Sequence, residues 1–297
     1  MLKDVIPQRA RSLGGFSVGR VLPSSLQRMV GPFVFFDHMG PVDFPPGVSR
    51  DVDVRPHPHI GLSTVTYLFD GEIMHRDSLN SEQAIRPGEV NWMVAGRGIT
   101  HSERFEKARR QGDRVHGIQA WVGLPVGQEE TEPAFSHHAG SDLPAIDDAG
   151  VTIRLIAGAA FGRRARVATH SPIFYADLRL ANGARIELPG EYAERGAFIV
   201  SGMAEVDGRD YEPGNMLTFV AGQPAILRAN AAAVVMLLGG EAIGERHVEW
   251  NFVSSSRERI AQAKADWRAG RFKLPDRDNS EFIPLPPDPP PPPPAMS

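Results

Sequence analysis

The chain has 297 residues, of which 41% are hydrophobic and 23% charged, with a formal net charge of −4 and no cysteine. This composition is typical of a soluble globular protein with one large domain or two ordinary ones, and it excludes collagen-like, disordered and disulfide-based proteins. The chain has no basic stripe, which argues against direct nucleic-acid binding. The missing cysteine excludes iron–sulfur clusters and cysteine zinc fingers, so any metal must be bound by His, Asp, Glu or backbone oxygen.

The amino-terminal sequence carries no signal for export or membrane insertion. Its first seven residues, MLKDVIP, contain no apolar segment of the signal-peptide kind. The longest wholly apolar run, residues 231–238, is far shorter than the roughly 18 residues that span a bilayer. We therefore expect a cytoplasmic protein without a membrane partner.

Regularly spaced glycine turns divide the chain into short segments rich in Val, Ile, Phe, Thr and Tyr, such as residues 63–69 and 151–156. The turns are Asp70-Gly71, Pro87-Gly88, Asn182-Gly183, Asp207-Gly208 and Pro213-Gly214. This pattern is typical of antiparallel hairpins and predicts an all-β fold, a sandwich or a barrel.

The histidines are concentrated in the first half, and four residues there have the spacing of a metal site. His57 and His59 form one alternate pair, and His101 and Glu103 form a second. On a strand, residues i and i+2 point to the same face about 6.5–7 Å apart, so each pair can converge on one ion. Three imidazoles and one carboxylate suit Fe(II), Ni, Cu, Co, Mn or Zn and can leave positions open for a substrate or O2.

An internal repeat predicts two β domains of similar plan. The pattern PGxxxxxVAG occurs at residues 87–96 and again at 213–222, and residues 67–71 are matched by residues 198–202. We place a metal-binding domain at 1–150 and a second domain at 151–275.

The second copy lacks every candidate ligand. When the offsets between the two copies are applied, the positions equivalent to His57, His59, His101 and Glu103 are Leu188, Gly190, Leu227 and Ala229. None of these side chains coordinates metals, so the sequence predicts one metal site, in the first half.

One helix, still within the second domain, and a tail follow the repeated β segments. Ser255 and Glu258 form a capping box that predicts a helix ending at Gly270, with Ile260, Lys264 and Trp267 on the face that docks across a sheet. Six consecutive prolines lie near the end of the chain, so we expect a flexible, polyproline-II-like tail over 276–297.

Several segments together resemble the pirin family. They are GPFVFFDHMGP at 31–41, HPHIG at 57–61, AGRGITHSE at 95–103, HGIQAWV at 116–122, WNFV at 250–253 and WRAGRF at 267–272. The resemblance covers nearly the whole chain. It implies a bicupin of two face-to-face antiparallel β-barrels with a carboxy-terminal helix, and one metal ion, usually iron, in the first barrel.

The resemblance also implies the site and its activity. The family's ligand pattern falls on His57, His59, His101 and Glu103. Some pirins are quercetin 2,3-dioxygenases, so we expect O2 and a quercetin-like flavonol or a related enolic or aromatic substrate. For a flavonol, Glu103 accepts the enol proton or remains a metal ligand as the substrate opens to a depside and carbon monoxide. The alternative is a metal- or redox-dependent regulator that binds a protein partner. We expect a monomer.

Three further residues are candidates for orienting the metal ligands or polar groups of the substrate: Gln119, His116 and His38. The chain also departs from the family pattern at one position. Relatives commonly read HPHxGFETVTY, and this chain has Ser63 where they have Glu. Glu103 is then the one obvious carboxylate of the predicted site.

Overall fold

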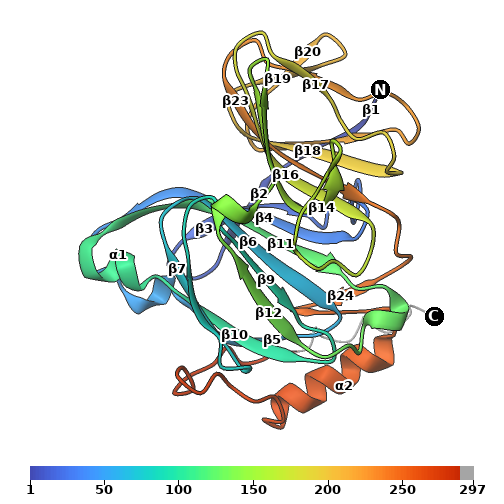
Figure 1. Cartoon of the computed structure of the whole chain (residues 1–297). Helices are drawn as coiled ribbons and strands as arrows, with labels where there is room; N and C mark the ends of the chain where they lie inside the picture. The colour runs from blue at the N-terminus through green and yellow to red at the C-terminus, as the bar shows by residue number, and fades with distance from the viewer. Residues whose placement is uncertain (288–297) are drawn as a thin grey trace, which may run out of the picture.

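The computed structural model describes residues 1–287 and contains two β-barrels, one above the other in Figure 1. Each barrel pairs a large antiparallel sheet with a four-stranded one. Within the described residues the α-helices are α1 (Glu106–Gln111) and α2 (Arg257–Arg268), and no helix is long and apolar enough to cross a membrane. The predicted all-β bicupin with a carboxy-terminal helix is confirmed.

The first barrel joins a seven-stranded sheet, in the order β12-β9-β6-β11-β4-β3-β2, to a four-stranded sheet, in the order β5-β10-β7-β8. The strands of the large sheet are β2 (Arg9–Ser12), β3 (Ser17–Leu22), β4 (Phe33–Phe44), β6 (Leu62–Asp70), β9 (Val90–Val94), β11 (Asp113–Gly123) and β12 (Ala134–His138). Those of the small sheet are β5 (Val54–His59), β7 (Ile73–Asp77), β8 (Glu82–Ile85) and β10 (Ile99–Arg104).

The second barrel joins an eight-stranded sheet, in the order β1-β21-β18-β23-β16-β14-β13 with β15 beside β14, to a small sheet in the order β17-β22-β19-β20. The strands of its large sheet are β1 (Leu2–Pro7), β13 (Ala145–Asp148), β14 (Val151–Ala160), β15 (Arg163–Arg164), β16 (Ile173–Leu180), β18 (Glu194–Ser201), β21 (Asn215–Phe219) and β23 (Ala233–Gly240). Those of its small sheet are β17 (Arg185–Glu187), β19 (Ala204–Val206), β20 (Arg209–Tyr211) and β22 (Ile226–Arg228).

The two barrels repeat one topology. The order β9-β6-β11-β4-β3 corresponds to β21-β18-β23-β16-β14, and β5-β10-β7-β8 corresponds to β17-β22-β19-β20. Strand pairing corrects two of the predicted equivalences, because His101 pairs with His57 whereas Leu227 pairs with Ile186. Ile186 therefore replaces His57, and Leu188 replaces His59. The offset fails because the second copy has two more residues between β17 and β18 than the first has between β5 and β6.

Two strands that precede residue 150, the predicted domain boundary, belong to the second barrel. β1 lies at the edge of the second barrel's large sheet, where it pairs with β21, and β13 pairs with β14 in the same sheet. The side chain of Ile6 on β1 is buried in the apolar core between the large sheets. The amino-terminal strand of the chain thus completes the second barrel, while the domain limits themselves stay a prediction.

The large sheets pack face to face over a shared apolar core that includes Phe36, Tyr67, Phe198 and Met236. The second barrel has a separate interior cluster that contains Leu188, Leu227 and Ala229. Apolar side chains fill the second barrel at the positions where the first has histidines, so its interior is closely packed and offers no metal ligand at these positions.

The helix α2 packs on the first barrel rather than the second. Its buried residues Ile260, Ala263 and Trp267 cluster with Ile60 and with Phe252 of β25 (Phe252–Ser254), the partner of β24 (His247–Glu249).

The amino-terminal cap of α2 lies one residue later than we predict. The side chain of Ser256 accepts a hydrogen bond from the backbone N–H of Arg259, while Ser255 is held by the carboxylate of Glu129. The glycine stop is as expected, because Gly270, which follows the cap residue Ala269, has a φ of 67°.

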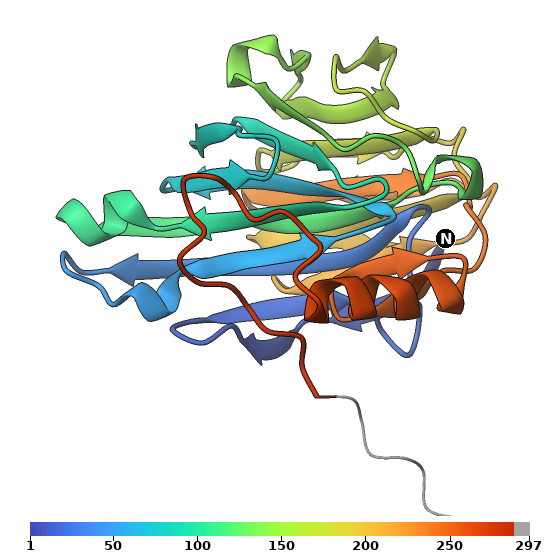
Figure 2. The same cartoon turned by 90° about the horizontal axis from the view of Figure 1, so that it is seen from below.

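The start of the predicted flexible tail is instead packed on the first barrel. Asp278 accepts two hydrogen bonds of 2.7 Å from the buried guanidinium of Arg104, and the backbone N–H of Ile283 donates to the carbonyl of Pro56 at 2.8 Å. Figure 2 shows this segment looping across the strands of the barrel. The polyproline run at 289–294 lies outside the described residues.

Candidate metal centre

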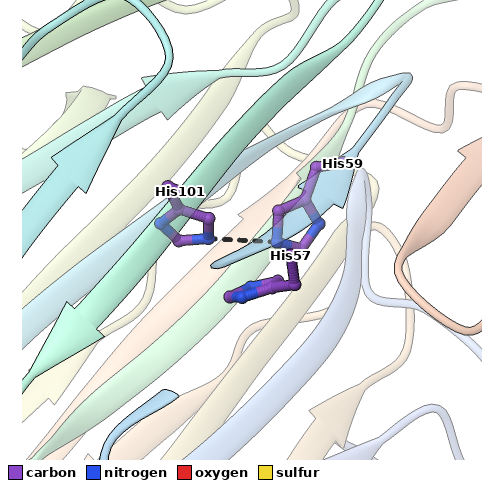
Figure 3. Close-up of side chains that lie close together, drawn as sticks. All are labelled: His57, His59 and His101. Atoms are coloured by element: carbon purple, nitrogen blue, oxygen red, sulfur yellow. Dashed lines mark hydrogen bonds between the residues drawn. The ribbon is translucent and has the colours of Figure 1, made fainter. Parts of the chain in front are cut away.

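Three of the predicted ligands form one compact group in the first barrel (Figure 3). β5 and β10 are antiparallel neighbours with His57 opposite His101, and strand alternation turns His59 to the same face as His57. One ring nitrogen from each histidine lies within 4.8 Å of the other two, and the Nε2 atoms of His59 and His101 are 3.1 Å apart. Within residues 1–287 this is the single cluster of metal-binding side chains with such spacing.

Backbone carbonyls fix which nitrogen of two imidazoles faces the cluster. His57 Nδ1 lies 2.9 Å from the carbonyl oxygen of Arg55, and His59 Nδ1 lies 3.0 Å from that of Asn251. A carbonyl oxygen can accept a hydrogen bond but not donate one, so both Nδ1 atoms carry the proton. In the neutral rings the Nε2 lone pairs are free to bind a cation.

Burial keeps the three rings neutral. It lowers the pKa of His57 to about 4, despite the hydrogen bond to Arg55, and it lowers the pKa values of His59 and His101 well below their usual value. Neutral imidazole is the form that coordinates metals, and three such nitrogens in one place suit a divalent first-row cation. The donor set thus fits the metal that the sequence predicts.

Glu103 lies on the wall of the cavity beside the histidines. A β-bulge follows His101, and Glu103 pairs with Val54 of β5. Its carboxylate is not one of the grouped ligand atoms. Burial raises the pKa of Glu103 to about 7, because removing the carboxyl group from water disfavours its charged form.

The histidine cluster opens on a cavity of about 350 Å³. Its walls are mostly apolar, and a stacked pair of rings, Phe35 and Trp121, lies on one of them with centroids 4.0 Å apart. The polar groups that line it are Arg20, Asp37, His57, His59, Glu103, Gln119 and Asn251. An apolar cavity with a few convergent polar groups is the usual form of a small-molecule site.

The sequence reasoning missed a second carboxylate in this cavity. Asp37 is buried and accepts two hydrogen bonds from the guanidinium of Arg20, at 2.9 and 2.8 Å. Burial raises its pKa in spite of Arg20. Alternation along β4 could have indicated this residue, because it places Asp37 on the same face as Phe35 and Met39, which also line the cavity.

Of the three predicted orienting residues, the structure brings one to the cavity. Gln119 lines the wall, and its Oε1 accepts a hydrogen bond from Thr66 at 2.7 Å. His38 and His116 do not reach the site: their Nε2 atoms are 2.8 Å apart, and His38 lies edge-on to Phe198 of the second barrel. Alternation explains the error, because His38 follows cavity-facing Asp37 and so points to the opposite face of β4.

Ser63 also lies on the opposite face from the histidines. It is buried and pairs with Val122, whereas its neighbour Leu62 packs with Phe35 and Trp121 inside the first barrel. A carboxylate at position 63 points away from the cavity, so the departure from the family pattern leaves the metal centre unchanged.

Residues from the end of the chain complete the cavity. Trp250, Asn251 and Ile283 all lie on its wall. They follow the second barrel in sequence and return to the first with β25 and the packed tail. No local pattern marks these residues as part of the site.

Comparisons with known proteins agree with this geometry. The pirin family model matches residues 15–122, and the model of the pirin C-terminal cupin domain matches residues 175–273. A pirin-like protein of Caulobacter vibrioides is 56% identical and covers 96% of this chain and 100% of its own length. A putative quercetin 2,3-dioxygenase of Pseudomonas aeruginosa is 39% identical over 97% of this chain and 90% of its own. The crystal structure of a quercetin 2,3-dioxygenase from Acinetobacter baumannii superposes with a TM-score of 0.88 at 32% identity, covering 96% of this chain and 95% of that one.

Proposed function

Since the chain belongs to the pirin family, we propose that it is a metal-dependent dioxygenase that opens quercetin-like flavonols with O2. The observation that carries the proposal is the group of three neutral histidines, two of which, His57 and His59, line an apolar, aromatic-lined cavity. The names of the relatives from Pseudomonas aeruginosa and Acinetobacter baumannii support the substrate class.

We assign one divalent cation, iron(II) in the first place, to His57, His59, His101 and Glu103. The bound metal supplies the Lewis-acid and redox chemistry that couples an enolic substrate to O2. Nitrogen and carboxylate ligands also accept nickel, cobalt, manganese, copper and zinc, so availability helps to decide which ion is bound.

The side chain of Glu103 is the group that takes up the enol proton of the substrate. The carboxylate of Glu103 lies at the wall of the cavity, where it accepts the proton of the flavonol enol as the substrate binds and returns it to the depside. Oxygen addition and ring opening then give a depside and carbon monoxide, which together contain all the atoms of the flavonol and O2.

The cavity walls orient a flat aromatic molecule. The Phe35–Trp121 stack offers an aromatic surface, and the guanidinium of Arg20 lies 4.4 Å from the centroid of Phe35. Gln119, which is held by Thr66, offers its side-chain amide N–H groups to a hydroxyl or carbonyl of the substrate. The mostly apolar lining keeps water away from the reacting centre.

The test has two parts. Elemental analysis of protein purified without added metal identifies the ion, and His57→Ala and His101→Ala are each expected to abolish its retention. Protein loaded with iron(II), nickel, cobalt or manganese is then given quercetin while oxygen uptake and carbon monoxide release are followed.

Full metal retention by either histidine variant refutes the site. Absence of turnover by fully metallated protein with every ion refutes the dioxygenase and favours the regulator that the sequence leaves as the alternative.

A further inference from the structure

A buried histidine that the proposed chemistry does not use lies directly behind one of the ligands. His75 on β7 is the neighbour of His101 on the side away from β5, and the two Nδ1 atoms are 3.4 Å apart. His75 is itself buried. The Nδ1 of His101 therefore faces a ring nitrogen, where His57 and His59 each face a backbone carbonyl.

The other side of His75 is held by a carboxylate. His75 Nε2 lies 3.0 Å from Oδ2 of Asp77, which is almost completely buried. The second oxygen of Asp77, Oδ1, accepts hydrogen bonds from the backbone N–H groups of Leu79 and Ser81, at 2.9 and 3.0 Å. Because these two bonds fix the carboxylate, Oδ2 is aimed at His75.

To bind a cation through Nε2, His101 must carry its proton on Nδ1, and this requirement sets the direction of the chain of contacts. The carboxylate of Asp77 accepts, so His75 Nε2 must donate. When the single proton of His75 is on Nε2, the lone pair on its Nδ1 accepts the Nδ1–H of His101. The remaining lone pair of His101 lies on Nε2, the atom that faces His59 at 3.1 Å.

We propose that Asp77 and His75 are positioning residues that fix the tautomer and ring orientation of His101 and so raise its affinity for a divalent cation. This inference rests on the metal site proposed above. Hydrogen-bond partners behind a ligating histidine commonly contribute 10–100-fold to metal affinity.

The second barrel supplies an internal comparison. Ser102 pairs with Arg76 in the first barrel, and the equivalent residue Arg228 pairs with Glu205 in the second. His75 and Asp77 therefore correspond to Ala204 and Val206, which are buried and apolar. The copy that lacks the ligating histidines lacks the two residues behind them as well.

The variant Asp77→Asn tests the direction of the chain. Asparagine keeps Oδ1 for the two backbone donors and places an NH2 group opposite His75. His75 Nε2 must then accept, His75 Nδ1 donates to His101, and the proton of His101 moves to Nε2, where it blocks coordination.

Two measurements read the result. In the ¹⁵N–¹H spectrum of the imidazoles, we expect the proton of His101 on Nδ1 in wild-type protein loaded with Zn(II), which occupies the Nε2 lone pairs, and on Nε2 in Asp77→Asn. The affinity for Co(II) alone, measured by competition with a chelator, is expected to fall about 10–100-fold in Asp77→Asn. His75→Phe, which removes the acceptor altogether, is expected to weaken Co(II) binding as well.

The control is Phe135→Leu. Phe135 stacks on His75 with ring centroids 4.4 Å apart but makes no hydrogen bond to it, so the variant disturbs packing alone. Its Co(II) affinity is expected to stay near the wild-type value. An Asp77→Asn protein that keeps the His101 proton on Nδ1, or that binds Co(II) as the wild type does, overturns the inference. Wild-type protein that binds no Co(II) refutes the proposed metal site and this inference with it, whereas an unaltered Asp77→Asn protein refutes the inference and leaves the metal site standing.

Discussion

Replacing Glu103 by glutamine tests whether burial in the cavity raises the pKa of this carboxyl group and so makes stability depend on pH. Burial raises its pKa from 4.5 to about 7. The folded protein thus holds the proton more tightly than the unfolded chain, and stability that is fully present below pH 4.5 is lost as the pH rises through 7. This increase in pKa means that metal-free protein loses about 3 kcal/mol of its unfolding free energy between low pH and pH 8.5.

Glutamine has nearly the same shape but stays neutral, so Glu103→Gln does not incur this loss. In urea titrations with a chelator present, the variant and the wild type are expected to agree within about 1 kcal/mol at pH 5. At pH 8.5 the variant is expected to be more stable by about 3 kcal/mol. With a divalent cation the order reverses, because a ligand that binds only the folded state stabilises the wild type more.

The control for this experiment is Glu132→Gln. Glu132 has a side chain that is 73% exposed and pairs with the exposed Arg97. Its replacement is expected to change stability by less than about 0.5 kcal/mol at either pH. A metal-free Glu103→Gln protein that is no more stable than the wild type at pH 8.5 refutes the argument from burial.

Three other substitutions test the fold around the site. His38→Leu is expected to leave the metal content unchanged in elemental analysis, because His38 lies between the barrels; a loss of metal contradicts that placement. Asp278→Ala leaves the guanidinium of Arg104 buried with weaker partners, so denaturation should show a loss of about 3 kcal/mol, whereas the exposed Asp276→Ala should show almost none. Leu227→Ala removes a fully buried side chain from the second barrel and should cost about 2–5 kcal/mol without lowering metal content; metal loss there argues against one site in the first barrel.

Features with a short sequence period could be predicted from the sequence. His57, His59 and His101 are spaced so that strand alternation brings each pair to one face, and the turn residues separate the strands that carry them. Each of these signals spans a few residues and depends on local backbone geometry. The duplicated plan was also visible, because both copies keep the same turn and strand pattern at 87–96 and 213–222.

The sequence could not show which face of a strand looks into the cavity. Asp37 and His38 are adjacent polar residues on one strand, and only the packing of the two large sheets sends one to the cavity and the other to the interface between barrels. The register of the second copy was likewise misjudged, because a connection two residues longer shifts the equivalence of Ile186 and Leu188 without any local sign.

The sequence by itself determined the β class, the duplication and the three histidines. Tertiary structure alone decided what surrounds them: Asn251 fixes His59, Ile283 closes the cavity, and His75 and Asp77 lie behind His101. The physical reason is distance along the chain. A hydrogen bond between residues 192 positions apart leaves no periodic trace, and it exists only once the hydrophobic packing of β25 and α2 returns the end of the chain to the first barrel.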